Sequence, residues 1–172
     1  MKKRKIWALL LIVFAVLMGG CFNDEETKTE PVALKEQTFT VYRATEPFLT
    51  AEKITIEDNG KSPAENALKS LVETKAADDK MAASFPDGTK VLAVEVKEDT
   101  AYANFSKELL NIGGGSMHEI MLTGAIVNTL TEFPEIKQVQ IMVDGKKIET
   151  LNGHLDLTDP LLRDESLLPK KK

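Results

Sequence analysis

Two kinds of hydrophobic periodicity alternate along this chain in an order that few folds accommodate. Apolar side chains recur at every second position in some segments, as in strands, and at every third or fourth position in others, as in helices. In chain order these segments predict a strand at 38–43, a helix at 62–76, strands at 90–97 and 101–105, a helix at 116–133 and a strand at 137–143, with short strands at 53–57 and 147–150. This is the order of a split β-α-β arrangement (βαββαβ). We therefore expect an α+β fold with two helices packed on one face of a small mixed sheet.

Both predicted helices begin with the residues of a capping box. Ser62 is placed to cap the first helix, and Glu65 follows three residues later. Ser116 and Glu119 repeat this spacing after the glycines at 113–115. The second helix has apolar side chains around most of its circumference, so we expect it to be the central one.

A glycine lies inside the second helix. Gly124 costs about 1 kcal/mol of helix stability relative to alanine, so its presence indicates a close contact at this position. The contact is either with the chain's own sheet or with a strand or partner that approaches closely.

The first 21 residues are organised like an export signal. Residues 2–5 are all basic, and residues 6–18 form an apolar run of thirteen side chains, shorter than the roughly 20 that a membrane-spanning helix needs. Gly19 and Gly20 then precede Cys21, the only cysteine. The segment resembles the lipobox of bacterial lipoproteins, which implies cleavage between Gly20 and Cys21 and lipidation of the Cys21 sulfur. The alternatives are an unmodified thiol or an uncleaved N-terminal anchor.

This interpretation divides the chain into four parts. Residues 1–20 are a lipoprotein signal peptide and residues 21–36 a flexible polar tether, with too few large apolar side chains to order itself. Residues 37–162 form the folded domain, and residues 163–172 a frayed polar tail. The expected location is the extracytoplasmic face of the cell membrane, with the acylated N-terminus in the lipid.

The charge balance argues against nucleic acid as a partner. Four basic and no acidic residues lie in the first 20, so the remaining 152 carry 18 basic and 27 acidic side chains. Phosphate backbones are bound by lysine and arginine, and a domain this acidic is poorly suited to them.

No motif in the sequence predicts catalysis, a cofactor or a metal. The glycines at 113–115 precede a helix but lack the lysine of a phosphate-binding loop. His118 and His154 are 36 residues apart and have no spaced ligand set around them. The serines lie in no nucleophile motif, and the carboxylates are interpreted as solvated acidic surface. These carboxylates include Glu95, Glu98, Asp99, Glu119, Glu132 and Asp144.

Several segments of the second half resemble the GerMN domain. They are residues 101–109, 128–134, 139–146, 153–157 and 160–161. The resemblance covers about residues 37–162 and implies an exported bacterial protein, often a lipoprotein, that is linked to sporulation and spore germination. It also implies a fold similar to the ring-building motifs of secretion and sporulation channels. The founding type carries two such domains in tandem, whereas this chain has room for one.

The function expected from these observations is a non-catalytic, membrane-anchored interaction or assembly domain in the cell envelope. Its partners are envelope proteins or further copies of itself. One alternative is a lipoprotein that binds a small ligand or a cation. Another is a hydrolase that uses a pair of carboxylates. The scarcity of aromatic residues, with the only tryptophan in the signal segment, argues against a sugar-binding cleft.

Overall fold

The computed structural model describes residues 35–77 and 85–170. Its elements are β1 (Glu36–Thr45), β2 (Phe48–Glu57), α2 (Pro63–Glu73), β3 (Val91–Lys97), β4 (Thr100–Phe105), the 3-10 helix η1 (Lys107–Asn111), α3 (Ser116–Leu130), β5 (Gln138–Val143), β6 (Lys146–Lys147), β7 (Leu161–Leu162) and the 3-10 helix η2 (Glu165–Leu167). The predicted helices and strands are present, although several boundaries move and the return strand is short. The structure adds η1, β7 and η2, which periodicity did not predict.

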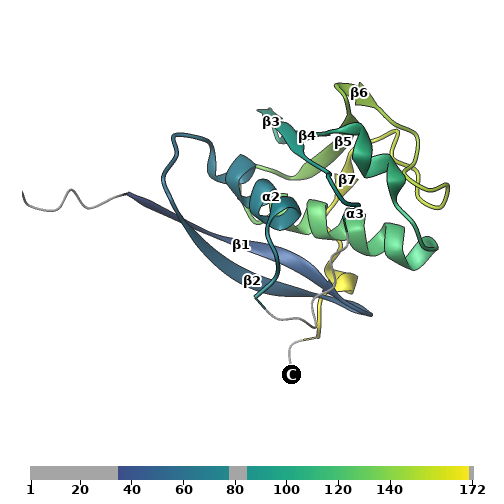
Figure 1. Cartoon of the computed structure of the whole chain (residues 1–172), viewed down its shortest axis with the longest axis horizontal. Coiled ribbons are helices and arrows are strands. Elements are labelled where there is room, and N and C mark those ends of the chain that lie inside the picture. The colour runs from purple at the N-terminus through teal and green to yellow at the C-terminus, as the bar shows by residue number, and fades with distance from the viewer. Residues whose placement is uncertain (1–34, 78–84, 171–172) are drawn as a thin grey trace, which may run out of the picture. The chain divides into compact units, whose positions relative to one another are not determined.

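The two helices lie between two separate sheets (Figure 1). On one side is the β1–β2 hairpin, and on the other is a five-stranded sheet in the order β3-β4-β5-β6, with β7 also paired to β5. Within this larger sheet β4 and β5 are parallel, while β3 pairs antiparallel with β4 and β6 with β5. The predicted α+β class with a mixed sheet and two packed helices is confirmed. The strands, however, divide into two sheets rather than forming one.

Strand β1 pairs with β2 on one edge and faces α3 with the other. One edge pairs with β2 along its whole length, from Glu36 opposite Glu57 to Thr45 opposite Phe48. On the other edge, the backbone N–H of Tyr42 donates a hydrogen bond of 2.9 Å to Thr129 Oγ1 on α3. Helix α3 therefore lies at the edge of β1 that a strand of the larger sheet would need for pairing.

Helix α2 follows the predicted pattern closely. Ser62 is the N-cap, and its hydroxyl accepts a hydrogen bond from the Glu65 N–H at 3.2 Å. The apolar face is buried through Ala64, Ala67, Leu68 and Leu71. Glu65 binds Lys61 and Lys69 on the opposite, solvent-facing side. This is an amphipathic helix that covers one surface of the core.

Helix α3 is buried around most of its circumference, as its composition predicted. Eleven of its fifteen residues are buried. The predicted capping box at its start is wrong: Gly115 is the N-cap and no side chain caps it. The Glu119 side chain binds another segment of the chain, described below, in place of the helix's own N-terminus. None of the helices in the described ranges is long and apolar enough to cross a membrane.

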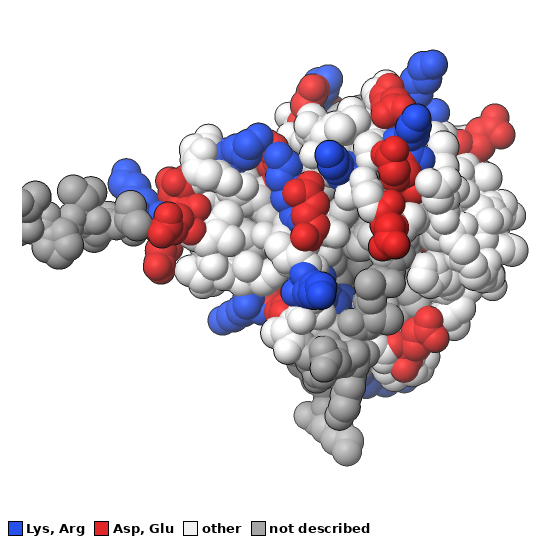
Figure 2. Space-filling view, viewed as in Figure 1, with Lys and Arg blue, Asp and Glu red and all other residues white. Residues whose placement is uncertain are grey.

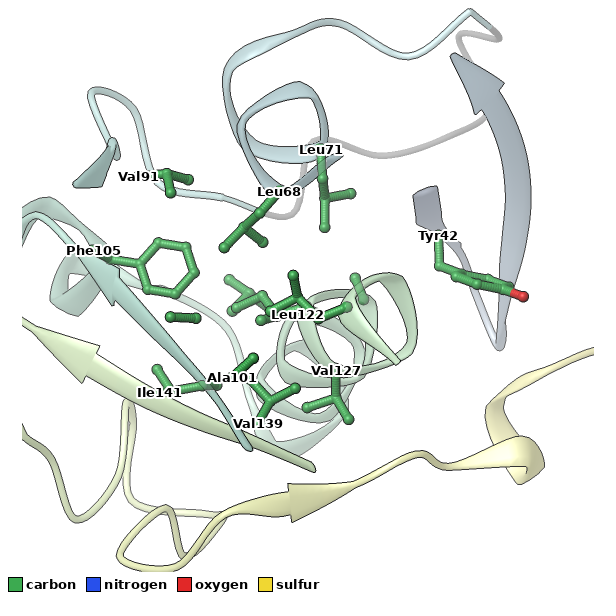
Figure 3. Close-up of a cluster of buried hydrophobic side chains, with 14 of the residues drawn as sticks. Tyr42, Leu68, Leu71, Val91, Ala101, Phe105, Leu122, Val127, Val139 and Ile141 are labelled. Atoms are coloured by element: carbon green, nitrogen blue, oxygen red, sulfur yellow. The ribbon is translucent and has the colours of Figure 1, made fainter. Parts of the chain in front are cut away.

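The hydrophobic core lies around α3 (Figure 3). Leu122 on α3 faces Leu68 and Leu71 of α2 on one side, and Ala101 and Ile141 of the larger sheet on the other. Phe105 at the end of β4 is fully buried and closes one end of this cluster. Burial of each large side chain stabilises the fold by roughly 1.5–3 kcal/mol, so this cluster is the main source of stability.

Residues 163–168 are packed, and the prediction of a frayed tail from residue 163 is wrong for them. Arg163 donates a hydrogen bond of 2.8 Å to the Asn128 carbonyl near the end of α3. Asp164 exchanges two hydrogen bonds with the Asn128 side chain. At the other boundary, Glu36 belongs to β1 and not to the tether.

Gly124 leaves space for this C-terminal segment. A Cβ atom at position 124 would lie 2.3 Å from Leu167 Cδ1 and 3.5 Å from Leu49 Cδ1 on β2. The close contact that the sequence indicated is therefore with side chains of the same chain. Glycine lets η2 and the hairpin both approach α3.

This contact predicts that the effect of Gly124→Ala on stability depends on the side chain at position 167. In a Leu167→Ala protein the new methyl group meets no clash, so Gly124→Ala should raise the free energy of unfolding by up to about 1 kcal/mol through helix propensity. With Leu167 present, the methyl group must displace that side chain, and the gain should shrink or become a loss. Urea unfolding of the four proteins tests this coupling. An equal effect in both backgrounds would contradict it.

Candidate functional site

Glu119 is a buried carboxylate that holds a loop. Its side chain is fully buried, at 0% exposure. Oε1 accepts hydrogen bonds from the Thr150 hydroxyl at 2.9 Å and from the backbone N–H groups of Leu151 and Asn152 at 3.0 and 3.1 Å. Oε2 accepts one from the N–H of His154 at 2.9 Å. The loop 150–154 thus wraps its backbone donors around one negative charge.

These donors keep the carboxylate ionised. Burial by itself raises the pKa of Glu119, but the hydrogen bonds from Asn152, Thr150, His154 and Leu151 together outweigh it, and the pKa lies below its ordinary value of 4.5. Solvated acidic surface is therefore the wrong interpretation for this residue. Its negative charge is used to position a loop of the same chain.

Arg43 on β1 is a buried cation at the end of α2. Its Nη1 donates to the carbonyls of Leu71 and Thr74 at 3.0 and 3.2 Å, and its Nη2 to the carbonyl of Ser70 at 3.2 Å. Its Nε pairs with Glu52 on β2. The last turn of α2 contains no basic residue of its own. Arg43 therefore satisfies the carbonyls at the helix end and joins the hairpin to α2.

Arg163 performs the same task at the end of α3. Besides the Asn128 carbonyl it binds Thr131 Oγ1 at 3.2 Å, the Tyr42 hydroxyl at 2.9 Å and Glu132 Oε1 at 2.8 Å. Its guanidinium also lies over the Tyr42 ring, 5.1 Å from the ring centre. The cluster joins the C-terminal segment, α3 and β1.

The two histidines singled out in the sequence lie in the loop 150–154 and at the start of α3. His154 belongs to the loop that Glu119 holds, and His118 lies in the first turn of α3, beside Gly114. Residues 149–158 line a shallow, open depression whose lining includes Glu149, His154 and Asp156. Within residues 35–77 and 85–170 there is no group of three side chains suited to hold a metal ion.

Acidic and basic side chains are interspersed on the face shown in Figure 2. Exposed side chains also form short-range ion pairs, such as Glu95 with Lys97 at 2.9 Å. The predicted lipidation site Cys21 and the cleavage site after Gly20 lie outside the described residues, so their chemistry rests on the sequence.

Sequence reasoning missed the roles of Arg43, Glu119 and Arg163. The residue types alone look like ordinary strand, helix and tail charges, because the backbone groups that each one binds are more than 25 residues away in the chain. A usable signal was the absence of basic residues in the last turn of either helix. Helix ends without local partners need cations or donors from elsewhere.

The Glu119 contacts predict a pH-dependent stability that one substitution removes. Because the pKa of Glu119 is lowered on folding, its contribution is fully present above the ordinary pKa near 4.5 and is lost as the pH falls through the lower folded value. Glu119→Gln should lower the free energy of unfolding at pH 7 by about 2 kcal/mol, since an amide cannot accept from all these donors. The difference from the wild type should shrink toward pH 3. Urea unfolding at both pH values measures this, with Glu135→Gln on the exposed surface as control. A pH-independent difference would contradict the assignment.

Comparison with known proteins connects this architecture to a family. The chain matches the Germane family, described as sporulation and spore germination, over residues 27–149. No significant match was found among curated proteins.

Three solved structures share the fold. The tandem GerMN domains of the sporulation protein GerM from Bacillus subtilis are 22% identical, with a TM-score of 0.63 over 74% of this chain and 46% of that one. The first GerMN domain of the same protein is 23% identical, with a TM-score of 0.62 over 74% of this chain and 98% of that one. A candidate lipoprotein from Clostridium perfringens is 24% identical, with a TM-score of 0.54 over 74% and 87% of the two chains.

These matches confirm the predicted resemblance and fix its extent. The chain spans about half of the tandem structure and nearly all of the single domain. One GerMN-like unit is therefore present in the matched region. The family match covers well over half of the sequence, and the chain belongs to the Germane family of sporulation and spore germination, with the fold of a GerMN domain.

Proposed function

We propose that this protein is a lipoprotein held at the extracytoplasmic face of the cell membrane by Cys21. It acts there, without catalysis, as a protein-protein interaction or assembly domain in sporulation or spore germination. The observation that carries the proposal is the use of its buried and half-buried charges. Glu119, Arg43 and Arg163 all bind backbone groups of their own chain.

This use of charge supports a scaffold rather than an enzyme. A catalytic carboxylate or cation needs atoms that face a substrate. Four donors of one loop surround Glu119, and helix carbonyls occupy Arg43. The family, too, is described by sporulation and spore germination and not by a reaction.

The N-terminal sequence supports anchoring. Residues 2–5 are basic, residues 6–18 are apolar, and Cys21 follows two glycines. The similar fold of the candidate lipoprotein from Clostridium perfringens agrees with this assignment. Strand β1 begins at Glu36, so fifteen residues, 21–35, lie between the proposed cleavage site and this strand. Fully extended, such a segment reaches about 50 Å, enough for the domain to meet partners away from the bilayer surface.

Anchoring is tested by replacing the cysteine. The wild-type chain should fractionate with membranes, incorporate labelled fatty acid, and accumulate as precursor in cells treated with globomycin. Cys21→Ala should abolish the label and the globomycin effect, because the acylated sulfur is gone. Cys21→Ala protein that is processed normally and still carries acyl label would contradict the proposal.

The interaction role is tested in intact cells that express the full chain. A membrane-impermeant, lysine-reactive cross-linker followed by purification under denaturing conditions should yield a covalent adduct with another envelope protein. The adduct should persist in Glu135→Gln and disappear in a chain whose domain is unfolded by Phe105→Asp. Absence of any heterologous adduct at saturating cross-linker would argue against an envelope partner.

A further inference from the structure

Among residues 35–77 and 85–170, no strand pairs with the outer edge of the ten-residue strand β2, Phe48–Glu57. Its partner β1 lies on one side only. Tyr42 on β1 directs its N–H away from β2, toward α3. The backbone N–H and C=O groups of the even-numbered residues of β1 therefore point away from β2. The antiparallel register pairs Tyr42 with Ala51. Ala51, Lys53, Thr55 and Glu57 therefore direct their backbone N–H and C=O groups away from β1, along the free edge.

The side chains along this edge are arranged in two stripes. Lys53, Thr55 and Glu57 are exposed on one face of the strand. Ile54 and Ile56 lie on the other face, where they are only half-buried and pack against the core. Helix α2 packs on β1, which leaves the isoleucines of the outer strand partly uncovered.

From this edge we infer that β2 pairs antiparallel with β2 of a second copy, about a two-fold axis at Thr55. The inference goes beyond the proposed function, because it names a self-association surface and does not depend on the membrane anchor. In this register Lys53 lies opposite Glu57 of the second copy, and Glu57 lies opposite its Lys53. Ile54 and Ile56 face the second copy's Ile56 and Ile54. The two hairpins become one continuous antiparallel sheet.

Charge selects this register among the alternatives. An axis at Lys53 places two lysines opposite each other, and an axis at Glu57 places two glutamates opposite each other. An axis at Glu52 places the two Glu52 carboxylates opposite each other, and Arg43 of the same chain already binds each of them. An axis at Thr55 opposes unlike charges twice and apolar side chains twice. It also places the outward-facing backbone groups of Lys53, Thr55 and Glu57 opposite one another, where they can exchange hydrogen bonds.

A disulfide across the axis tests the geometry. In a hydrogen-bonded antiparallel pair the two Cα atoms are about 5.5 Å apart, which suits a disulfide. Thr55→Cys in the full chain, in detergent micelles under mild oxidation, should give a covalent dimer.

Thr38→Cys is the matched control for this disulfide. Thr38 is an exposed threonine on β1, hydrogen-bonded to Thr55 at 3.0 Å. In the dimer it would lie three strand spacings, about 14 Å, from Thr38 of the second copy, too far for a disulfide. The wild-type chain measures how much covalent dimer forms through Cys21 alone. Equal cross-linking of Thr55→Cys and Thr38→Cys would overturn the inference.

A charge exchange tests the register without new covalent chemistry. Lys53→Glu and Glu57→Lys should each weaken the dimer about tenfold or more, because attraction becomes repulsion at two symmetric sites. The double variant Lys53→Glu/Glu57→Lys should return the dissociation constant to within about threefold of the wild type. Sedimentation equilibrium of the full chains in density-matched detergent measures this, and thermal unfolding checks that each variant is folded.

Two results would overturn the inference. One is a wild-type chain that stays monomeric at all concentrations, and the other is a double variant as weak as the single ones. Either result leaves the anchoring and envelope-partner proposals untouched, because those are measured by acyl label and by heterologous adducts.

Discussion

The burial of α3 is the constraint on which the rest of the structure depends. Eleven of the fifteen residues of α3 are buried, so its buried polar groups need partners from other segments. Glu119 near its start binds the loop at 150–154, and Arg163 binds the carbonyl of Asn128 near its end. Midway, Gly124 gives room to Leu49 and Leu167. Satisfying this one helix thereby places the hairpin, the loop and the C-terminal segment.

The two helices are completed by arginines from other elements. Arg43 comes from a strand that precedes α2, and Arg163 from the segment after β7, but both donate to carbonyls in the last turns of helices. A cation at this end also interacts favourably with the helix dipole. Because each arginine bridges elements far apart in sequence, both make the folding of the hairpin and the C-terminal segment dependent on the helices. Charge here serves tertiary assembly, which is consistent with a domain that presents surfaces to other proteins.

The division of strands into two sheets has a consequence for association. In a single sheet the first strand would be paired on both sides, whereas here no strand in the described part of the chain pairs with the outer edge of β2. Natural proteins usually blunt such edges with charge, and Lys53 contributes this. With a two-fold axis at Thr55, Lys53 of each copy lies opposite Glu57 of the other, so the same charges are complementary between two copies. An edge of this kind discourages random pairing and favours one register.

The sequence alone determined the order of the main helices and strands, the amphipathic face of α2, the central position of α3 and the family resemblance. These follow from local spacing, which is legible in a single chain. It also indicated a close contact at Gly124 without naming Leu167. The tertiary structure alone decided that Glu119 is buried, that Arg43 and Arg163 complete helix ends, and that β1 pairs with β2 and not with the larger sheet. Each of these depends on groups brought together from distant parts of the chain, and no local pattern records which donor will reach which acceptor.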